Sequence, residues 1–214
     1  MTADTLPPLF GIGGKLRHGK DAVADRLVEV HGFVKVNMSS AIDTFLRGIN
    51  PLVPVRRFGS WADRIPVLRS MTRNVSYVDL VDQVGFTDAK ANPEVRRLLQ
   101  QLGAAAREHV APDFWVSKAA EQIAAHRAAG RGVVLSGVRF PNECDIITSV
   151  GGTLLWVHRP GVVADGAAAA DVTENGVSED DFDATIVNDG TLSDLARKTD
   201  DLVEPVSISP AVFA

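Results

Sequence analysis

The feature that most constrains this chain is a glycine-framed turn near its N-terminus, Gly14-Lys15-Leu16-Arg17-His18-Gly19-Lys20. A short apolar run at residues 9–12 precedes the turn, and apolar residues at helical spacing follow it between residues 20 and 30. The order is therefore strand, glycine loop and helix. In that setting G-x-x-x-x-G-K predicts a loop whose backbone N–H groups and helix N-terminus cradle phosphates, with Lys20 reaching the terminal ones.

The same residues allow two other interpretations. A dinucleotide fingerprint, G-x-G-x-x-G, starts at Gly11 and Gly13 but has Leu16 where its third glycine belongs, so we discount it. The residue after Lys20 is Asp21, whereas such loops usually carry a Ser or Thr whose hydroxyl binds magnesium. Asp21 is a candidate magnesium ligand, directly or through water, and is equally explained as an acid that stabilises the helix N-terminus.

Strands and helices alternate along most of the chain. We predict strands at residues 9–12, 33–38, 132–136, 153–158 and 184–187, and helices at residues 20–30, 93–110, 115–129, 141–150 and 192–202, with a further helix capped by Ser40. This alternation predicts an α/β fold, with an open, mostly parallel sheet and helices on both faces. At 214 residues we expect a single domain with two insertions, short helices and loops at 50–92 and a mobile lid or loose loop at 160–183.

Charge and cysteine content exclude several classes of protein. The net charge is −5, and nine acidic residues with no Lys or Arg fall between Pro160 and Ala196, which leaves the rest of the chain at +4. This divided charge, with only 6% aromatic residues, argues against a nucleic-acid-binding surface. Cys144 is the only cysteine, which excludes an internal disulfide and a multi-cysteine zinc site. The chain shows no membrane-length apolar run and no signal-like N-terminus, so we expect a cytoplasmic protein.

A polar stripe follows the helix predicted at residues 93–110. Arg96, Gln100, Gly103 and Arg107 step by four, three and four residues, opposite the apolar positions. Two guanidinium groups and an amide on one stripe can grip a phosphate and a base, although a solvated helix face gives the same pattern. A glycine in mid-helix costs about 1 kcal/mol relative to alanine, which favours close approach of a ligand or another backbone at Gly103.

A third candidate is Ser136-Gly137-Val138-Arg139-Phe140-Pro141-Asn142-Glu143, at the carboxyl end of a predicted buried strand. Ligands bind at that edge of open parallel sheets, so Arg139, Asn142 and Glu143 are candidate binding residues. Asn142 and Glu143 are equally explained as first-turn residues of the helix that follows.

Taken together, these runs resemble the phage-type deoxynucleoside monophosphate kinases. The resemblance covers residues 9 to 203 and rests on the loop at 14–20 with Asp21, R-R-L-L-Q-Q-L-G at 96–103 with Arg107, V-R-F-P-N-E at 138–143 and N-D-G-T-L at 188–192. It implies a P-loop kinase fold, a three-layer sandwich with a five-stranded parallel sheet and a lid. It also implies transfer of the γ-phosphoryl group of ATP to a deoxynucleoside monophosphate, with Mg²⁺ as cofactor.

The resemblance also implies roles for individual residues. The ATP phosphates would lie against Gly14, Lys15, Arg17, His18, Gly19, Lys20 and Asp21. The acceptor nucleotide would lie against Ser39, Arg96, Gln100, Arg107, Asn142 and Glu143. Lys20, Arg139 and Arg159 would stabilise charge on the transferring group, and Asp21 would be the metal ligand. The expected partners are the two nucleotides and a second copy of the chain, in the host cytoplasm if the protein is phage-encoded.

Two departures from the family pattern bear on the metal and the lid. Gly137 stands where many relatives carry an acidic residue ahead of V-R-F-P-N-E, so the carboxylate expected to organise magnesium is missing there. Val177 stands where a histidine is common, before Ser178 and Glu179. Two alternatives therefore stay open: another small P-loop kinase, of the dephospho-coenzyme A or adenylate kinase type, and a nucleotide-binding module without turnover.

Overall fold

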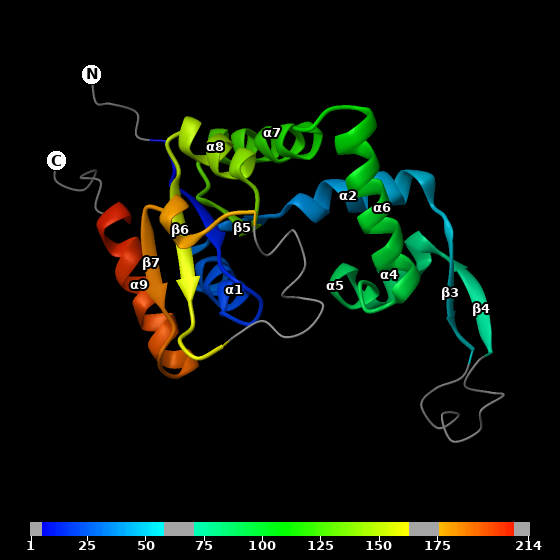
Figure 1. Ribbon diagram of the computed structural model, residues 1–214, viewed down its shortest axis with the longest axis horizontal. Helices are drawn as coiled ribbons and strands as arrows, with labels where there is room; N and C mark the ends of the chain where they lie inside the picture. Colours follow the sequence, from blue (N-terminus) through cyan, green and yellow to red (C-terminus); the bar gives the residue numbers. More distant parts are fainter. Residues whose placement is uncertain (1–5, 58–70, 163–175, 208–214) are drawn as a thin grey trace. The chain divides into compact units, whose positions relative to one another are not determined.

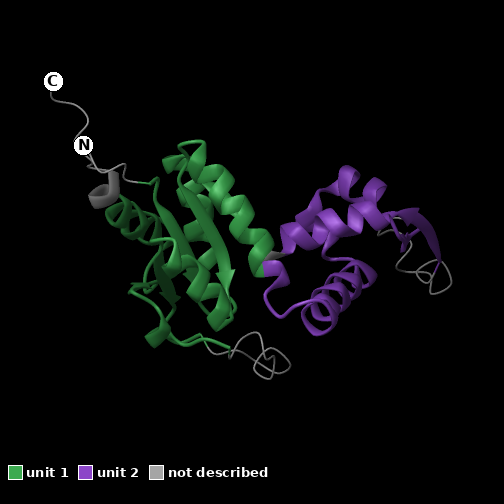
Figure 2. Cartoon of the chain, turned by 90° about the horizontal axis from the view of Figure 1, so that it is seen from above, with its two compact units in different colours: residues 1–37, 116–214 green, residues 38–115 purple. Residues whose placement is uncertain are grey.

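The computed structural model describes residues 6–57, 71–162 and 176–207 (Figure 1). The chain divides into two compact units, the first formed by residues 1–37 and 116–214 and the second by residues 38–115 (Figure 2). The glycine loop and the strand-end run belong to the first unit, and the arginine stripe belongs to the second. The predicted insertion at 50–92 falls within the second unit, and residues 163–175 of the predicted lid lie outside the described residues.

The first unit is built on a five-stranded parallel sheet, which confirms the predicted fold class. The strand order is β2-β5-β1-β6-β7, with bounds β1 (Leu9–Gly13), β2 (Val34–Val36), β5 (Val133–Val138), β6 (Thr153–His158) and β7 (Ala184–Val187). All five residues of β1 are buried, as are the middle four of β6. Strands covered on both faces are continuous apolar runs, which is why these two were readily predicted.

Helices cover both faces of this sheet (Figure 1). On one face α1 (Lys20–His31) packs against α9 (Leu192–Ser207), and their buried residues join those of the sheet in one core. On the other face α8 (Pro141–Ser149) places Ile147 against Gly11 of β1, and α7 (Phe114–Ala128) lies beside α8. The carboxyl ends of β5, β1 and β6 therefore open side by side between the two helical layers.

Three element boundaries in the first unit differ from the prediction by two residues or more. The strand predicted at 33–38 is shorter, because Met38 already opens the next helix. Strand β5 continues to Val138, because Ser136 and Val138 still pair with β1 despite their loop-like sequence. Helix α9 runs to Ser207 rather than to residue 202, because Val203 is still packed in the core and no glycine stops the helix there.

The second unit combines helices with a two-stranded hairpin. Its elements are α2 (Met38–Ile49), β3 (Leu52–Arg56), β4 (Thr72–Ser76), α4 (Tyr77–Val84), α5 (Phe86–Ala89) and α6 (Pro93–His109). One of its core clusters contains Leu46, Val53, Tyr77, Val81 and Val95. Helix α2 begins two residues before Ser40, so the prediction of Ser40 as its cap was wrong.

The hairpin was not predicted. Strands β3 and β4 pair antiparallel, with Pro54 opposite Asn74, where we predicted only helices and loops. Pro54 concealed the strand, because proline cannot donate to a ladder and argues against a central strand. A ribbon of two strands tolerates it, since every strand is then an edge.

An ion-pair cluster ties α1 to α9 and gives a testable pH dependence. Asp200 accepts from Arg26 Nε (3.0 Å) and Nη2 (2.7 Å), and His31 Nε2 lies 2.7 Å from Asp200 Oδ1. These contacts, with Arg26 first, lower the pKa of Asp200 to about 2. The ionised carboxylate therefore stabilises the fold above pH ~4, the ordinary pKa of Asp, and this stabilisation is lost as the pH falls towards the folded-state value.

We expect Asp200→Asn to lower the free energy of unfolding by about 1 to 2 kcal/mol at pH 7, because it removes charge-assisted hydrogen bonds at a site that is partly exposed. Urea unfolding between pH 7 and 2.5 measures the difference, which should shrink as the pH drops below 4. Asp201→Asn is the matched control, since its pair with Arg197 at 3.4 Å is exposed. Equal losses for the two variants would contradict the assignment of this cluster.

Candidate nucleotide-binding site

The glycine loop has the backbone that a phosphate site requires. Gly14 and Gly19 have φ values of +142° and +103°. A Cβ atom would lie 2.6 Å from Val157 O at Gly14 and 2.7 Å from Asn188 Nδ2 at Gly19, so both positions require glycine. Between them His18 N–H donates to Lys15 O at 3.2 Å, which closes a tight turn. The turn leads into α1, whose N-cap residue Gly19 has no side chain that could accept from the first N–H groups of the helix. An anion can accept those hydrogen bonds instead.

Lys20 is the first residue of α1 and is only 8% exposed. Its Nζ lies 3.5 Å from Lys15 O, so the side chain folds back over the loop. An ammonium group at a helix N-terminus adds its charge to the positive end of the helix dipole, and both attract anions. The local charge therefore favours an anionic ligand at this position.

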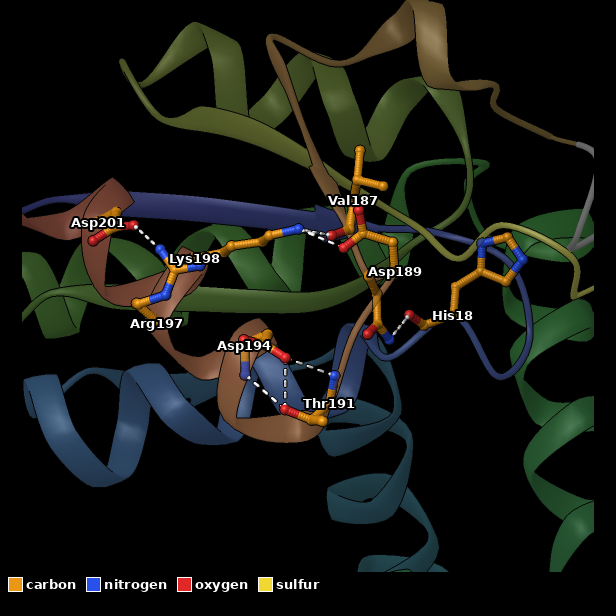
Figure 3. Close-up of polar contacts among 9 residues, drawn as sticks. His18, Val187, Asp189, Thr191, Asp194, Arg197, Lys198 and Asp201 are labelled. Carbon is orange, nitrogen blue, oxygen red and sulfur yellow. Dashed lines mark hydrogen bonds and ion pairs between the residues drawn. The ribbon is translucent and has the colours of Figure 1, made fainter.

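Asn188, directly after β7, braces the loop from the side. Its side-chain Nδ2 donates to His18 O at 3.0 Å, the contact drawn at His18 in Figure 3, and its backbone N–H donates to His158 O at 2.7 Å. Asn188 is 5% exposed and lies against Gly19. From the sequence we predict no structural role for the N-D-G-T-L run. The signal that could have revealed one is a polar residue, Asn188, directly after a predicted strand, because ligands bind at the carboxyl ends of parallel strands.

The rest of the N-D-G-T-L run fixes the turn between β7 and α9 (Figure 3). Lys198 Nζ donates to Val187 O at 2.7 Å and to Asp189 Oδ1 at 2.6 Å. Thr191 and Asp194 cap α9 reciprocally, with Thr191 N–H donating to Asp194 Oδ2 at 2.9 Å and Asp194 N–H donating to Thr191 Oγ1 at 3.2 Å. This capping, led by the hydrogen bond from Thr191, lowers the pKa of Asp194. Asn188 is thereby held on a rigid support.

Three cations surround the loop. Lys15 and Arg17 extend from the loop itself, and Arg159 follows the neighbouring strand β6, with its backbone N–H donating to His18 Nδ1 at 3.2 Å. All three side chains are exposed, and none makes an ion pair or hydrogen bond within the described part of the chain. The backbone of Arg159 thus lies beside the loop, and a role of its side chain near the transferring phosphate stays a prediction.

The end of β5 contains a bulge at Gly137. Ile12 pairs with Ser136 and Gly13 with Val138, so Gly137 is the extra residue, and its φ is +79°. A carboxylate residue here would be strained in that conformation, which gives a backbone reason for the missing acidic residue. Asp21, exposed in the first turn of α1, is the carboxylate nearest in sequence to the loop lysine.

The V-R-F-P-N-E run opens α8 with a buried cap. Glu143, 4% exposed, accepts from Arg139 N–H at 2.7 Å and from Phe140 N–H at 3.3 Å through Oε2. Gly176 packs against the same backbone, because a Cβ there would clash with Arg139 O. The carboxylate of Glu143 therefore shapes the loop that carries Arg139. Its predicted contact with an acceptor nucleotide stays a prediction.

In the second unit the predicted stripe on α6 is only partly as expected. Arg96, Gln100 and Arg107 are exposed, but Gly103 is buried with Val95 and Ala106. A Cβ at Gly103 would lie 3.3 Å from Ile42 Cδ1, and Gly103 O accepts from Trp115 Nε1 at 2.9 Å. Of the two explanations offered for Gly103, a ligand or another part of the chain, the structure supports the second, because the glycine lets α2 approach α6.

Ser39 lies in the first turn of α2. Its hydroxyl accepts a hydrogen bond from Lys90 Nζ at 3.1 Å, and the same ammonium group lies 4.0 Å from the centre of the Phe86 ring. The residue expected to contact an acceptor thus has a cation beside it, which the sequence did not reveal because 51 residues separate the two.

Comparison with known proteins shows the family. A family model described as deoxynucleotide monophosphate kinase matches residues 64–199, and the chain belongs to that family. The match includes the arginine stripe, the V-R-F-P-N-E run and the N-D-G-T-L run, but it begins after the glycine loop, whose assignment rests on its own geometry.

Viral relatives are consistent with this family. A putative deoxynucleotide monophosphate kinase of Acanthamoeba polyphaga mimivirus is 36% identical over 62 residues, which are 29% of this chain and 31% of that protein. The uncharacterized protein ORF76 of Ictalurid herpesvirus 1 is 24% identical over 211 residues, covering 96% of this chain and 70% of its own length. The chain thus spans less than a third of the mimivirus protein.

Solved structures show the fold. Dephospho-CoA kinase from Campylobacter jejuni superposes with a TM-score of 0.52 at 12% identity, covering 94% of this chain and 97% of that one. The fold is that of P-loop kinases, as the resemblance implied. Among the described residues, no helix is long and apolar enough to cross a membrane. The cytoplasmic location and the pairing with a second copy of the chain stay predictions.

Proposed function

We propose that this protein transfers the γ-phosphoryl group of ATP to a deoxynucleoside monophosphate, forming ADP and a deoxynucleoside diphosphate. The observation that carries the proposal is the glycine loop of a kinase-family chain, where a nearly buried Lys20 and a helix N-terminus without a side-chain cap converge. An oxygen of the acceptor phosphate attacks the γ-phosphorus, and the bond to the β–γ bridging oxygen breaks. This transfer calls for alignment and charge neutralisation rather than a nucleophilic side chain.

The donor triphosphate would lie along the loop. Backbone N–H groups between Gly14 and Lys20 bind its oxygens, and Lys20 reaches the β- and γ-phosphates. Lys15, Arg17 and Arg159 are exposed cations around the same loop, available to neutralise the charge that spreads over the γ-phosphoryl group. His18 contributes backbone to the loop, and its side chain points away into the protein towards Val162.

In the second unit the candidate acceptor-binding residues lie on α6 and α2. Arg96, Gln100 and Arg107 supply two guanidinium groups and an amide on exposed positions of α6, and Ser39 adds a hydroxyl beside a cation. In the first unit the candidates are Arg139 and Asn142, at the end of β5 and the start of α8, and Glu143 is the residue that shapes their loop. Planar guanidinium groups suit bidentate phosphate binding.

The described residues around the loop offer Mg²⁺ one carboxylate, that of Asp21. Mg²⁺ in kinases keeps several waters and takes only one or two carboxylates, together with substrate phosphates. Asp21 is one exposed carboxylate next to Lys20, whereas Gly137 offers none, and no cluster of three potential ligands occurs among the described residues. When bound, Mg²⁺ would neutralise β- and γ-phosphate charge, and Asp21 would hold it directly or through water.

The test is an acceptor panel. ADP formation from ATP and Mg²⁺ is measured with dAMP, dGMP, dCMP, dTMP, the four ribonucleoside monophosphates and dephospho-coenzyme A. We expect ADP formation only with certain deoxynucleotides. Turnover with dephospho-coenzyme A alone would favour the related kinase chemistry, and ATP binding without acceptor-dependent ADP would favour a binding module and contradict the proposal.

A further inference from the structure

His18 is a buried histidine that connects the glycine loop to the chain after β6. It is 4% exposed, and its two ring nitrogens have three backbone neighbours. Nδ1 lies 3.2 Å from Arg159 N and 3.3 Å from Val157 O, and Nε2 lies 3.3 Å from Val162 O. The imidazole thus links the glycine loop to the backbone of residues 157, 159 and 162.

The three contacts distinguish between the protonation states of the ring. With its hydrogen on Nε2, neutral His18 accepts from Arg159 N–H and donates to Val162 O, which satisfies two contacts. With its hydrogen on Nδ1, it would donate to Val157 O only, and an imidazolium would turn an N–H group towards Arg159 N–H. Because only the Nε2–H form accepts from Arg159 while donating to Val162, the geometry selects that tautomer.

The surroundings of the ring are rigid. Val157 O lies against Gly14, Asn188 holds His18 O, and the His158 ring lies edge-on at 5.6 Å from the His18 ring. Nδ1 of His158 lies 3.6 Å from Glu179 Oε2. A side chain held on this many sides can transmit the position of the loop to the backbone that it contacts.

We propose that His18 is a positioning residue for Arg159. Its Nδ1 fixes the Arg159 backbone N–H at the edge of the glycine loop, so that the guanidinium group is presented to the transferring phosphate. The inference rests on the proposed function, because only phosphoryl transfer gives the position of Arg159 a kinetic consequence. A charge-stabilising arginine that is misplaced by about 1 Å loses much of its effect in the transition state.

Two substitutions test the roles of the two ring nitrogens separately. In His18→Asn the side-chain oxygen takes the place of Nδ1 and can accept from Arg159 N–H, whereas in His18→Gln the side-chain NH₂ takes the place of Nε2 and can donate to Val162 O. We expect His18→Gln to lower kcat by about 10- to 100-fold with the KM for ATP changed less than about threefold, because the lost interaction belongs to the transition state. His18→Asn should restore most of kcat.

A double-mutant cycle with Arg159→Ala tests whether His18 acts through Arg159. In the Arg159→Ala background, His18→Gln should lower kcat by less than about twofold, because the residue that it positions is gone. An equal loss in both backgrounds, or equal kcat for the Asn and Gln variants, would overturn the inference. His126→Ala, in the last turn of α7, is the control for a histidine substitution away from the site.

The tautomer is measured separately by long-range ¹H–¹⁵N NMR of the histidine side chains in the protein without nucleotide. We expect His18 in the Nε2–H form, and an Nδ1–H form would overturn the inference whether or not the enzyme turns over. Absence of ADP formation by the unsubstituted protein with every acceptor would instead contradict the proposed function, so the two failures are distinguishable.

Discussion

Lys20→Ala should lower kcat/KM for acceptor-dependent ADP formation by about 10²- to 10³-fold, the loss typical of removing one preorganised charge-stabilising group. Lys20 is nearly buried at the start of α1, and its ammonium group lies over the loop that would hold the phosphates. The substitution removes the charge that reaches the terminal phosphates, whereas the glycine backbone stays in place. Steady-state kinetics with the best acceptor of the panel measure the loss.

The control for this prediction is Lys118→Ala. Lys118 is a surface lysine of α7 that pairs with Glu121 at 2.8 Å, and its loss should leave kcat/KM unchanged. The Lys20→Ala protein should keep its circular dichroism spectrum, because the loop geometry depends on Gly14, Gly19 and Asn188 rather than on this side chain. Retention of more than about a third of wild-type kcat/KM would place Lys20 outside the catalytic charge network.

Gly14→Ala should destabilise the protein by about 3 kcal/mol and abolish measurable turnover, because it combines backbone strain with a clash. The φ of +142° is unfavourable for alanine, and the added Cβ would lie 2.6 Å from Val157 O, a backbone atom of the adjacent strand. Either the loop or the end of β6 must move, and both carry residues of the proposed site. Urea unfolding and the ADP assay measure the two effects.

Gly151→Ala measures the cost of a positive φ where no clash occurs. Gly151 has a φ of +72°, but a Cβ there has no atom within 4 Å. Its substitution should cost only about 1 kcal/mol, the left-handed penalty for a residue with a side chain, and leave turnover intact. Similar losses of stability at both glycines would contradict the added cost expected at Gly14 from its φ and its contact with Val157 O.

The sheet and its helices were largely predictable from the sequence. Strand β6 and strand β7 were predicted with their observed bounds, because buried apolar runs between turn signals leave little ambiguity. The start of α6 was equally clear, since Pro93 suits the first turn of a helix, and the structure adds Asn92 as its cap. The hairpin was not, because Pro54 and the polar residues of β4 disguise strands whose only partners are each other.

The candidate site was predictable only where its residues are close in sequence. The loop at 14–20 was found from its spacing, but its brace Asn188 and the link from His18 to Arg159 join residues more than 140 positions apart. Gly103 was assigned to the polar face because helical periodicity leaves a residue at the border of two faces undecided, and the contact with Ile42 settles it. Tertiary contacts of this kind leave no local pattern in the sequence.

The most direct test of the central claim is transfer of label from [γ-³²P]ATP. The protein is incubated with Mg²⁺ and each deoxynucleoside monophosphate, and the products are separated by thin-layer chromatography. We predict that label appears in a deoxynucleoside diphosphate, in an amount equal to the ADP formed, and that Lys20→Ala removes it. Label released as inorganic phosphate, or retained in ATP by a folded protein that binds the nucleotide, would contradict the proposed kinase activity.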